Sequence, residues 1–392
     1  MKKGILLLLI LSLFLTGCWN RRELNELAIT LAIGIDKSED GYLISAQVVV
    51  PKEVSMNAGN GGSPVTLLQA QGETVYEAIR KITKESPRKI YPGHLRMLVI
   101  GESLAEDGIG DSLDLLSRDW ELRSDFYVVV AKDSKAEDIL NIQTPLESIP
   151  SNKMFNTLKI SEENWSATVG VTLDDLIADL ISDGKEAVLT GIIIRGNPEN
   201  ASSLQNVETI TPSATIQYQD LAVFKNDKLV GWLNEEESRS YNAIINQVKN
   251  TVSTISCPKE GKASIEVLNF NTDVKGEVFH GIPKVDVSID IEANLGALEC
   301  SINITKPESI EILENIYAKE VKESIEQSIE SVQEKYDSDI FGFGNAIHRT
   351  NPKLWNTMKK EWDQHFTDLE VNIKVNVKIL KTGTVDNTLI EK

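Results

Sequence analysis

One cysteine near the amino terminus, Cys18, has the surroundings that covalent lipid attachment requires. It follows Leu15-Thr16-Gly17, so a large apolar residue stands three positions before it and small residues stand directly before it. Small neighbours leave the thiol open to diacylglyceryl transfer at a membrane surface and leave the preceding peptide bond open to a peptidase. An ordinary secretory cleavage site would show an A-x-A pattern, which this segment lacks. We therefore predict cleavage before Cys18 and lipid on this cysteine.

The residues before Cys18 have the composition of an export signal. Lys2 and Lys3 precede an apolar run from Ile5 to Leu15. This run of about eleven residues is well short of the roughly twenty that a membrane-spanning helix needs. We expect residues 1–17 to be removed, after which the lipid holds the chain on the extracytoplasmic face of a membrane.

The other two cysteines, Cys257 and Cys300, have no metal-type spacing between them. Because the exterior of a cell is oxidising, they could form a disulfide there. Two buried free thiols are the alternative. The sequence leaves both interpretations open.

The remaining chemically active residue types form no catalytic or metal-binding pattern. The four histidines are far apart, and the chain has no H-E-x-x-H, G-x-S-x-G, P-loop or complete dinucleotide motif. Asp36-x-Ser38-x-Asp40-Gly41 resembles the start of a calcium loop, but Gln47 stands where such a loop requires a bidentate Glu. We predict no catalytic residue, no metal, no cofactor and no enzymatic activity.

The composition describes an acidic globular protein. Apolar residues make up 41% of the chain and charged residues 25%, which excludes wholesale disorder. The formal net charge is −19, and it becomes about −21 when Lys2 and Lys3 are removed with the signal. Nucleic acid and anionic lipid headgroups repel such a surface. The charge excludes nucleic acid as a partner and suggests a body that stands off the bilayer or docks on it through another protein.

The first half of the mature chain alternates strands with helices. Ala28 to Asp36 and Tyr42 to Val50 flank an Asp-Gly turn and predict a β-hairpin. Further strands are expected at 65–71, 95–100, 125–131 and 187–195, and helices at 73–83, 109–118, 138–141 and 173–181, with a polar stretch before the last helix. This order predicts an α/β or α+β layer structure.

The pattern of apolar and polar residues changes after Gly196 to Ser203, whose sequence GNPENASS is typical of a linker. We therefore expect an N-terminal α/β domain at 18–195, a linker at 196–205 and a C-terminal α+β region at 206–392 with room for two domains. In that region, 285–291 and 369–379 alternate apolar and polar residues, as strands with one wet face do. The predicted fold class is α+β: a lipid-anchored, multi-domain mixed α/β protein whose sheets are mostly antiparallel or mixed and carry flanking helices.

One long helix is expected in the C-terminal region. Thr305 and Glu308 have the spacing of a capping box, and Pro307 falls in the first turn. Apolar residues then recur every three or four positions, at Leu313, Tyr317, Val321, Ile325, Ile329, Val332 and Tyr336. This stripe either binds a partner or packs on the protein's own sheet, and we favour packing.

Several segments taken together resemble one family. They are CWNRRELNEL at 18–27 with AITLAIGIDK through Lys37, the corner of Arg118, Asp119 and Arg123 before VVVA at 128–131, Gly231-Trp232-Leu233 with Glu237-Ser238-Arg239, and DIFGFG at 339–344 with Trp355, Trp362 and Phe366. Over nearly the whole mature chain they resemble the C subunit of the spore germination receptors, the Ger(x)C lipoproteins. Ser240 departs from the family, which tends to have Gly after Glu-Ser-Arg. The Arg118 corner is either a structural ion-pair corner or a partner contact, and we favour the structural interpretation.

The resemblance implies a non-enzymatic subunit of a nutrient-germinant receptor on the outer face of the spore inner membrane. Its implied partners are an A subunit and a membrane-embedded B subunit that resembles amino-acid transporters. It also implies a three-domain mixed α/β protein. Two other classes stay open from the residues alone: a solute-binding lipoprotein of a transporter, which would show two matched lobes around a cleft, and a cell-envelope hydrolase, which would show His or acidic groups converging in one pocket.

Overall fold

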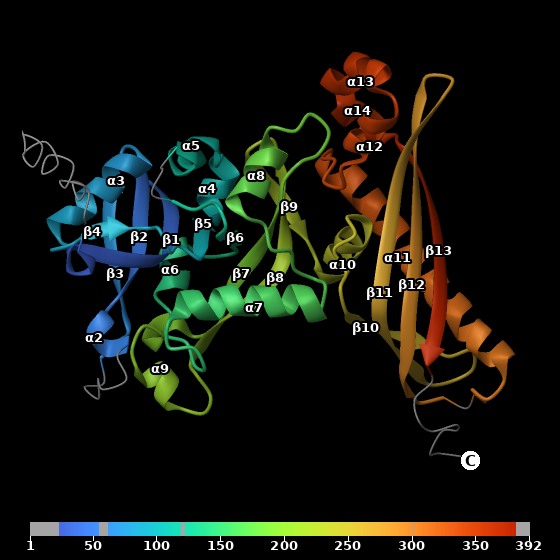
Figure 1. Ribbon diagram of the computed structural model, residues 1–392, viewed down its shortest axis with the longest axis horizontal. Coiled ribbons are helices and arrows are strands. Elements are labelled where there is room, and N and C mark those ends of the chain that lie inside the picture. The colour runs from blue at the N-terminus through green and yellow to red at the C-terminus, as the bar shows by residue number, and fades with distance from the viewer. Residues whose placement is uncertain (1–22, 55–61, 119–121, 301, 382–392) are drawn as a thin grey trace, which may run out of the picture.

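The computed structural model describes residues 23–54, 62–118, 122–300 and 302–381 (Figure 1). In these ranges the chain forms two sheets, one of nine strands and one of four. The large sheet and its helices occupy one end of the long axis of the molecule, and the small sheet with the helix α11 (Pro307–Tyr336) occupies the other end (Figure 1). Among the described residues, no helix has the length and apolarity that a membrane crossing needs. The mixed α/β fold class is confirmed.

The large sheet is mixed and has the order β3-β2-β1-β5-β6-β7-β8-β9, with β4 also paired to β1. The strands β1, β4, β5, β6 and β7 are mutually parallel, while β2, β3, β8 and β9 pair antiparallel to their neighbours. Their bounds are β1 Leu27–Ser38, β2 Gly41–Val49, β3 Val65–Gly72, β4 Lys89–Tyr91, β5 Met97–Gly101, β6 Tyr127–Ala131, β7 Val188–Gly196, β8 Ala214–Lys225 and β9 Lys228–Leu233. The predicted hairpin of β1 and β2 is confirmed.

Helices cover both faces of this sheet because its central strands are apolar on both faces. In β6, Val128 and Val130 belong to one layer of buried side chains, and Val129 and Ala131 belong to the opposite layer. The first layer packs under α3 Val75–Lys81, η2 Ile82–Lys84, α4 Glu102–Asp107, α5 Gly110–Arg118 and α8 Leu173–Leu180. The second packs under α6 Ala136–Leu140 and α7 Pro150–Asn164. Continuous apolar runs are typical of strands buried in this way.

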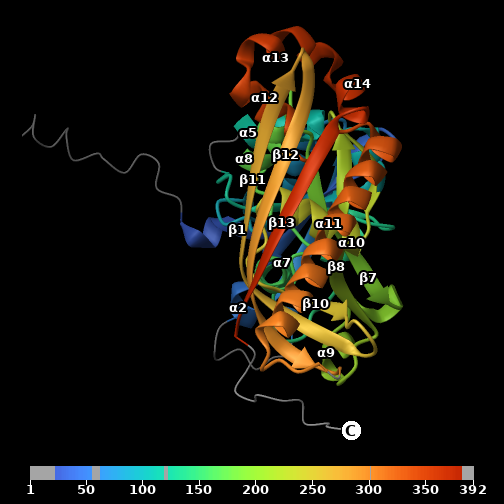
Figure 2. The same cartoon turned by 90° about the vertical axis from the view of Figure 1, so that its right-hand side faces the viewer.

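The small sheet has the order β10-β11-β12-β13, and β12 and β13 are parallel. Its strands are β10 Thr251–Ser256, β11 Lys262–Phe279, β12 Ile282–Leu298 and β13 Glu370–Lys381. The helix α11 connects β12 toward β13 and runs alongside the sheet (Figure 2). At one end of the sheet lie α12 Phe343–Thr350, α13 Pro352–Met358, η4 Lys359–Glu361 and α14 Trp362–Thr367 (Figure 2).

The apolar face of α11 packs inside the protein, as expected. Leu313, Tyr317 and Ile325 are buried, and Val321 and Tyr336 pack partly buried against the same cluster. The predicted capping box is wrong. The residue before the first turn is Lys306, which makes no side-chain cap, and the hydroxyl of Thr305 donates a 2.5 Å hydrogen bond to Asn303.

Two segments differ from the sequence-based expectation. The polar stretch before residue 173 contains α7, whose only buried apolar side chains besides Pro150 are Met154 and Leu158. The segment 196–205 connects β7 to β8, which pair with each other, and Ala201 within it is fully buried. Strands from both sides of this segment therefore share one sheet, and the division of the chain into domains stays a prediction. Short elements complete the fold: η1 Leu24–Glu26, α2 Pro51–Val54, η3 Pro198–Asn200, α9 Gln205–Glu208 and α10 Glu235–Ile244.

Candidate functional site

The predicted lipid attachment residue, Cys18, lies outside the described residues. The strand β1 begins at Leu27, nine positions after this cysteine in the sequence. Cys257 and Cys300 are joined by a disulfide with an S–S distance of 2.07 Å. Cys257 directly follows β10, and Cys300 lies two positions after the end of β12; both strands pair with β11. The bond thus ties together two strands that do not pair with each other.

The described residues contain no group of three or more His, Cys, Asp or Glu side chains arranged to hold a metal ion. His94, His280 and His348 are exposed, and the ring of His348 stacks on Trp355 with centroids 5.8 Å apart. Asp36, the first residue of the calcium-like motif, is buried and accepts hydrogen bonds from the backbone N–H groups of Ala136 and Glu137 at 2.7 and 2.9 Å. Burial raises the pKa of Asp36, and these two bonds act against that rise. Its role is to fix the start of α6.

The corner before β6 is made of local ion pairs. Arg118 donates two 2.9 Å bonds to Asp114 one helical turn earlier, and Arg123 pairs with Asp125 at 2.8 Å. All four side chains are more than half exposed, so that these pairs contribute little to stability. Asp119, the third member of the predicted trio, lies outside the described residues.

The motif Glu237-Ser238-Arg239 lies in α10, where the large sheet meets the small one. Glu237 closes a capping box with Asn234 and accepts a 2.6 Å hydrogen bond from Ser331 and a 3.4 Å bond from Lys335, both on α11. Burial acts to raise the pKa of Glu237, but the bonds from Ser331 and Asn234 and the charge of Lys335 hold it below its usual value. The Glu237 carboxylate therefore caps the start of α10 and also fixes α11 to α10.

Arg239 fastens α10 to the first strand of the small sheet. Its Nη2 donates to the Thr251 hydroxyl at 2.7 Å and to the Val252 carbonyl at 2.9 Å. The guanidinium lies over the ring of Trp165 at 5.0 Å, and the Trp165 indole donates to Glu235 at 3.0 Å. A planar guanidinium is suited to such combined stacking and forked hydrogen bonding. We call the contacts of Glu237, Arg239 and their partners the junction.

The neighbouring Gly231-Trp232-Leu233 motif belongs to the same junction. A Cβ on Gly231 would come within 2.4 Å of the Tyr336 ring at the end of α11, so the close approach of α11 to β9 requires glycine here. The Tyr336 hydroxyl donates to the Trp232 carbonyl at 3.0 Å. The Trp232 indole donates to Glu102 at 2.9 Å, and Lys132, which is paired with Asp220, lies 4.9 Å from its ring centroid.

Asp339, the first residue of the DIFGFG motif, forms the second connection between the two sheets. Its buried carboxylate accepts four hydrogen bonds of 2.7 to 3.1 Å, from the N–H groups of Gly342, Phe343 and Gly344 and from the Trp362 indole. Burial raises the pKa of Asp339 to about 6, and the four donated bonds act in the opposite direction. Its own carbonyl accepts from Glu186, which precedes β7.

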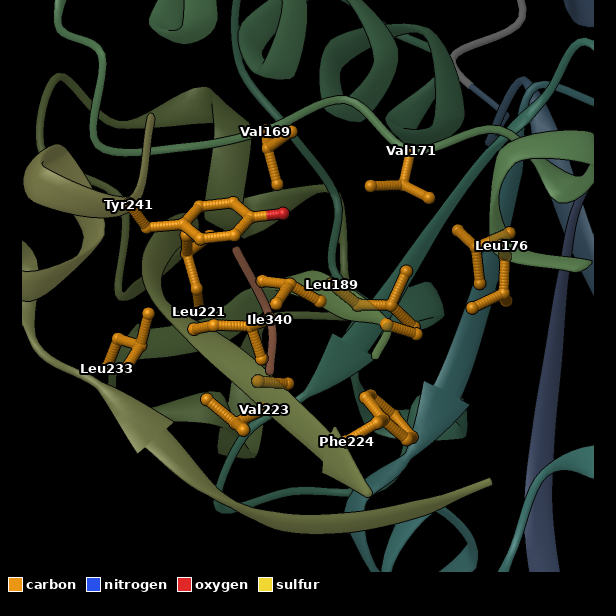
Figure 3. Packing of buried hydrophobic residues seen from close by; sticks show 14 of the residues in the cluster. Val169, Val171, Leu176, Leu189, Leu221, Val223, Phe224, Leu233, Tyr241 and Ile340 are labelled. Carbon is orange, nitrogen blue, oxygen red and sulfur yellow. The ribbon is translucent and has the colours of Figure 1, made fainter. Parts of the chain in front are cut away.

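The junction encloses packed apolar side chains and a groove. Figure 3 shows Tyr241 of α10 and Ile340 of the DIFGFG motif packed in one layer with Leu221 and Val223 of β8. Outside this layer, a groove of about 540 Å³ opens between α10, β10 and α11. Its polar lining includes Arg239, Glu235, Glu236, Glu320 and Tyr317, and no lining residue is a His or Cys. Within this groove, the Ser324 hydroxyl donates to the Glu236 carboxylate at 3.3 Å.

Comparisons with known proteins cover the whole of this architecture. A family model described as the spore germination protein N-terminal domain matches residues 20–194, and one described as spore germination B3/GerAC like, C-terminal, matches residues 219–383. Spore germination protein KC of Bacillus subtilis (strain 168) is 31% identical over 98% of this chain and 96% of that protein. The chain belongs to this spore germination family. The Ger(x)C resemblance predicted from the motifs is confirmed.

Other members of the family align over the same length. Spore germination protein A3 of Bacillus subtilis (strain 168) is 26% identical over 98% of this chain and 99% of that protein, and GerQC of Bacillus cereus is 22% identical over 98% of this chain and 100% of that protein. The crystal structure of the GerBC protein has the same fold, with a TM-score of 0.57 and 19% identity over 89% of this chain and 96% of that one.

Of the family motifs within the described residues, Gly231-Trp232-Leu233, Glu237-Ser238-Arg239 and DIFGFG lie at the connections between the two sheets, whereas residues 28–37 lie in β1 and VVVA lies in β6. Three residues that contribute to these contacts were not predicted. Trp165 follows a helix that was itself missed, and Lys132 and Asp220 are brought together by strands far apart in sequence. Ser240, where the family tends to have Gly, is buried and its hydroxyl contacts that of Ser324 on α11 at 3.1 Å.

Proposed function

We propose that this protein is the lipid-anchored C subunit of a nutrient-germinant receptor, needed for spore germination in response to small nutrients. The observation that carries the proposal is the match of spore germination family models to both halves of the chain, together with relatives aligned from end to end. Lipid on Cys18 would hold it on the outer face of the spore inner membrane, next to the A subunit and the membrane-embedded B subunit.

The protein acts by assembly and not by catalysis. The lipid confines it to the membrane surface, which raises its effective concentration near its partners. The junction and Asp339 hold the two sheets in one arrangement, so that a contact on either sheet is transmitted through a stiff body. This arrangement suits a subunit that positions or couples other subunits.

The solute-binding alternative requires two matched lobes around a ligand-sized cleft. Within the described residues, a nine-stranded sheet covered by helices on both faces stands against a four-stranded sheet with one long helix. These two parts are not versions of one lobe, and no comparison favours a transporter. The receptor proposal therefore explains the molecule better.

The proposal is tested in spores that lack this chain or carry Cys18→Ala. We expect loss of the response to one class of nutrient in a panel of single nutrients, with germination under pressure or a non-nutrient agent intact. Reintroduction of the natural chain at its own locus should restore the response. A normal response to every nutrient in the deletion strain, with no paralogue present, would contradict the receptor role, and natural protein whose Cys18 carries no lipid by mass spectrometry would contradict the anchor.

A further inference from the structure

One long stretch of this acidic chain is strongly basic. The 17 residues from Arg80 to Arg96 contain six Lys or Arg and one Glu, a net charge of +5, in a chain with a net charge of −19. Arg80, Lys84, His94 and Arg96 are exposed in the structure. The overall charge alone predicts repulsion from anionic lipid, but charge in one place acts only within about a Debye length, roughly 10 Å at 0.1 M salt.

The fold places this stretch directly beside the entry of the chain from its anchor. Within it, β4 pairs in parallel with the first residues of β1, with Lys89 opposite Leu27 and Ile90 opposite Ala28. The N–H of Arg96 donates to the Leu31 carbonyl at 2.9 Å. Leu27 is nine positions after Cys18, and an extended chain of that length spans at most about 30 Å. A lipid on Cys18 therefore holds these cations close to the bilayer.

Several cations lie at one end of the parallel strands of the large sheet. Cations gather where β4, β5 and β6 begin, and they lie on both faces of the sheet. One pocket of about 250 Å³ has Arg80, Lys89 and Arg118 in its lining, and a second of about 490 Å³ has His94, Arg96, Arg123 and Asp125. Arg118 and Arg123 are paired with Asp114 and Asp125, so the exposed charge of this end comes mainly from the stretch 80–96. At the opposite end the charges are mixed: Glu102 follows β5, Lys132 follows β6, and Asp107 pairs with Lys37 of β1 at 2.9 Å.

An aromatic residue on α3 strengthens the resemblance of this edge to a membrane-contacting surface. The side chain of Tyr76 is 51% exposed although it is large. The Arg80 guanidinium lies 5.0 Å from its ring centroid and donates a 2.8 Å hydrogen bond to its hydroxyl. Side chains with an apolar body and a polar or charged tip are favoured at the interface between lipid and water.

We propose that the surface formed by α3, η2 and β4 with Arg96, which we call the basic edge, lies on the anionic headgroups of the membrane and orients the body. The inference rests on lipid attachment at Cys18 in the proposed function. The lipid supplies attachment and the basic edge supplies direction, because the acidic remainder of the protein is repelled from the same surface. Each Lys or Arg near an anionic surface contributes about 1 kcal/mol, which biases the orientation of a body that the lipid already holds.

The test uses the mature chain from residue 18 with Cys18→Ser, so that no lipid contributes. Binding is measured by co-sedimentation with phosphatidylcholine vesicles and with vesicles in which about a third of the lipid is phosphatidylglycerol. We expect binding only to the anionic vesicles and its loss as salt rises from about 0.1 M to about 1 M. Replacing Arg80, Lys84 and Arg96 by Gln should weaken it about fivefold per charge, on the order of a hundredfold in all.

The matched control changes the same charge at the other end of the molecule. The control variant replaces Lys353, Lys360 and Lys374 by Gln. These lysines are exposed and lie on or near the small sheet, and the triple variant should bind as the natural sequence does. Equal binding to neutral and anionic vesicles, or equal losses in the two triple variants, would overturn the proposal. Circular dichroism of both variants confirms that they are folded.

A second measurement covers the case in which untethered binding is too weak to detect. The thiol of Cys18 in the mature chain is coupled to a maleimide lipid, and hydrogen exchange is followed on neutral and anionic vesicles. Exchange in residues 80–96 should slow on anionic vesicles only, while β12 and β13 stay unchanged; equal exchange on both surfaces would contradict the basic edge. Neither vesicle assay depends on lipid attachment in the cell. If mass spectrometry of spores finds Cys18 unmodified, the proposed anchor is contradicted. The vesicle results would still decide whether the basic edge binds anionic lipid.

Discussion

At the scale of single residues, Asp339 shows how a carboxylate can be structural in a protein of 59 acidic residues. Its side chain is 1% exposed and accepts from three successive backbone N–H groups and one indole. These hydrogen bonds fix the turn between α11 and α12. Gly342 in this turn has φ +74°, a conformation that favours glycine. Removing the acceptor would leave four buried donors without partners.

We expect Asp339→Asn to destabilise the protein by about 2–4 kcal/mol in urea unfolding, because the amide presents a donor to groups that are themselves donors. The size of this loss should depend on pH. The pKa of Asp339 is raised from 3.8 to about 6, so the carboxyl contributes most to stability below about pH 4 and loses that contribution as pH rises to about 6. The difference between the two proteins should therefore shrink from pH 4.5 to pH 7 and stay level above that.

A matched variant separates this effect from general acidity. Asp363→Asn removes an exposed carboxylate from α14 in the same region and should change stability by less than about 0.5 kcal/mol at every pH. A pH-independent difference between Asp339→Asn and the natural sequence would show that the buried carboxyl does not titrate in this range.

At the scale of elements, helices and strands are predicted best from the sequence where a single hydrophobic periodicity dominates the segment. The hairpin of β1 and β2, the helix α11 and the alternating strands β12 and β13 follow from spacing alone. The helix α7 could not be found in this way, since only Met154 and Leu158 mark its buried apolar side beyond Pro150. It forms because the large sheet offers an apolar face that must be covered, which is a property of the tertiary structure.

The sequence motifs of the site were predicted, but the spatial arrangement of their side chains was not. Arg239 and Trp165 are 74 positions apart, and only the folded chain brings the guanidinium over the ring. For the segment 196–205, the local structure was predicted correctly but its place in the fold was not. Its Gly, Asn and Ser residues indicate a loop correctly, but composition alone does not show that the strands on either side of the loop pair with each other.

The disulfide belongs to the scale of elements because it closes a covalent loop around β11 and β12. Cys257 and Cys300 are 43 positions apart, for which the chain-entropy model gives about 4 kcal/mol of stabilisation. We propose that the bond forms in the exported protein, and we expect Cys257→Ser with Cys300→Ser to lower stability by about 2–4 kcal/mol.

Reduction of the natural protein is the independent control for this prediction. A reducing agent should lower the urea midpoint of the natural sequence to that of the double serine variant and leave the variant unchanged. Equal midpoints for all three samples would contradict a stabilising bond between these two cysteines.

At the scale of the whole molecule, the two sheets share one continuous core. The main cluster of buried apolar side chains includes Leu98 and Val128 of the large sheet and Val287 and Ile289 of the small sheet. Burial of this kind couples the stability of the parts it joins. We therefore expect one cooperative thermal transition, with calorimetric and van't Hoff enthalpies that agree.

Hydrogen exchange locates this cooperativity along the chain. Amides in β6 and β12 should open with the same free energy, since each sheet loses part of its core when the other unfolds. A lower opening free energy for β12 would show that the small sheet unfolds on its own and that the junction does not couple the two parts.

The position of β1 has a mechanical consequence. It is the first strand of the chain and also an inner strand of the large sheet, bonded to β2 on one side and to β4 and β5 on the other. A pull through the proposed lipid on Cys18 would enter at the amino end of β1 and act along the strand. Such a force loads the hydrogen bonds of both flanking ladders in shear and all together, whereas a pull on an edge strand would break them one after another. The proposed tether would therefore pull on a strand that is held on both sides.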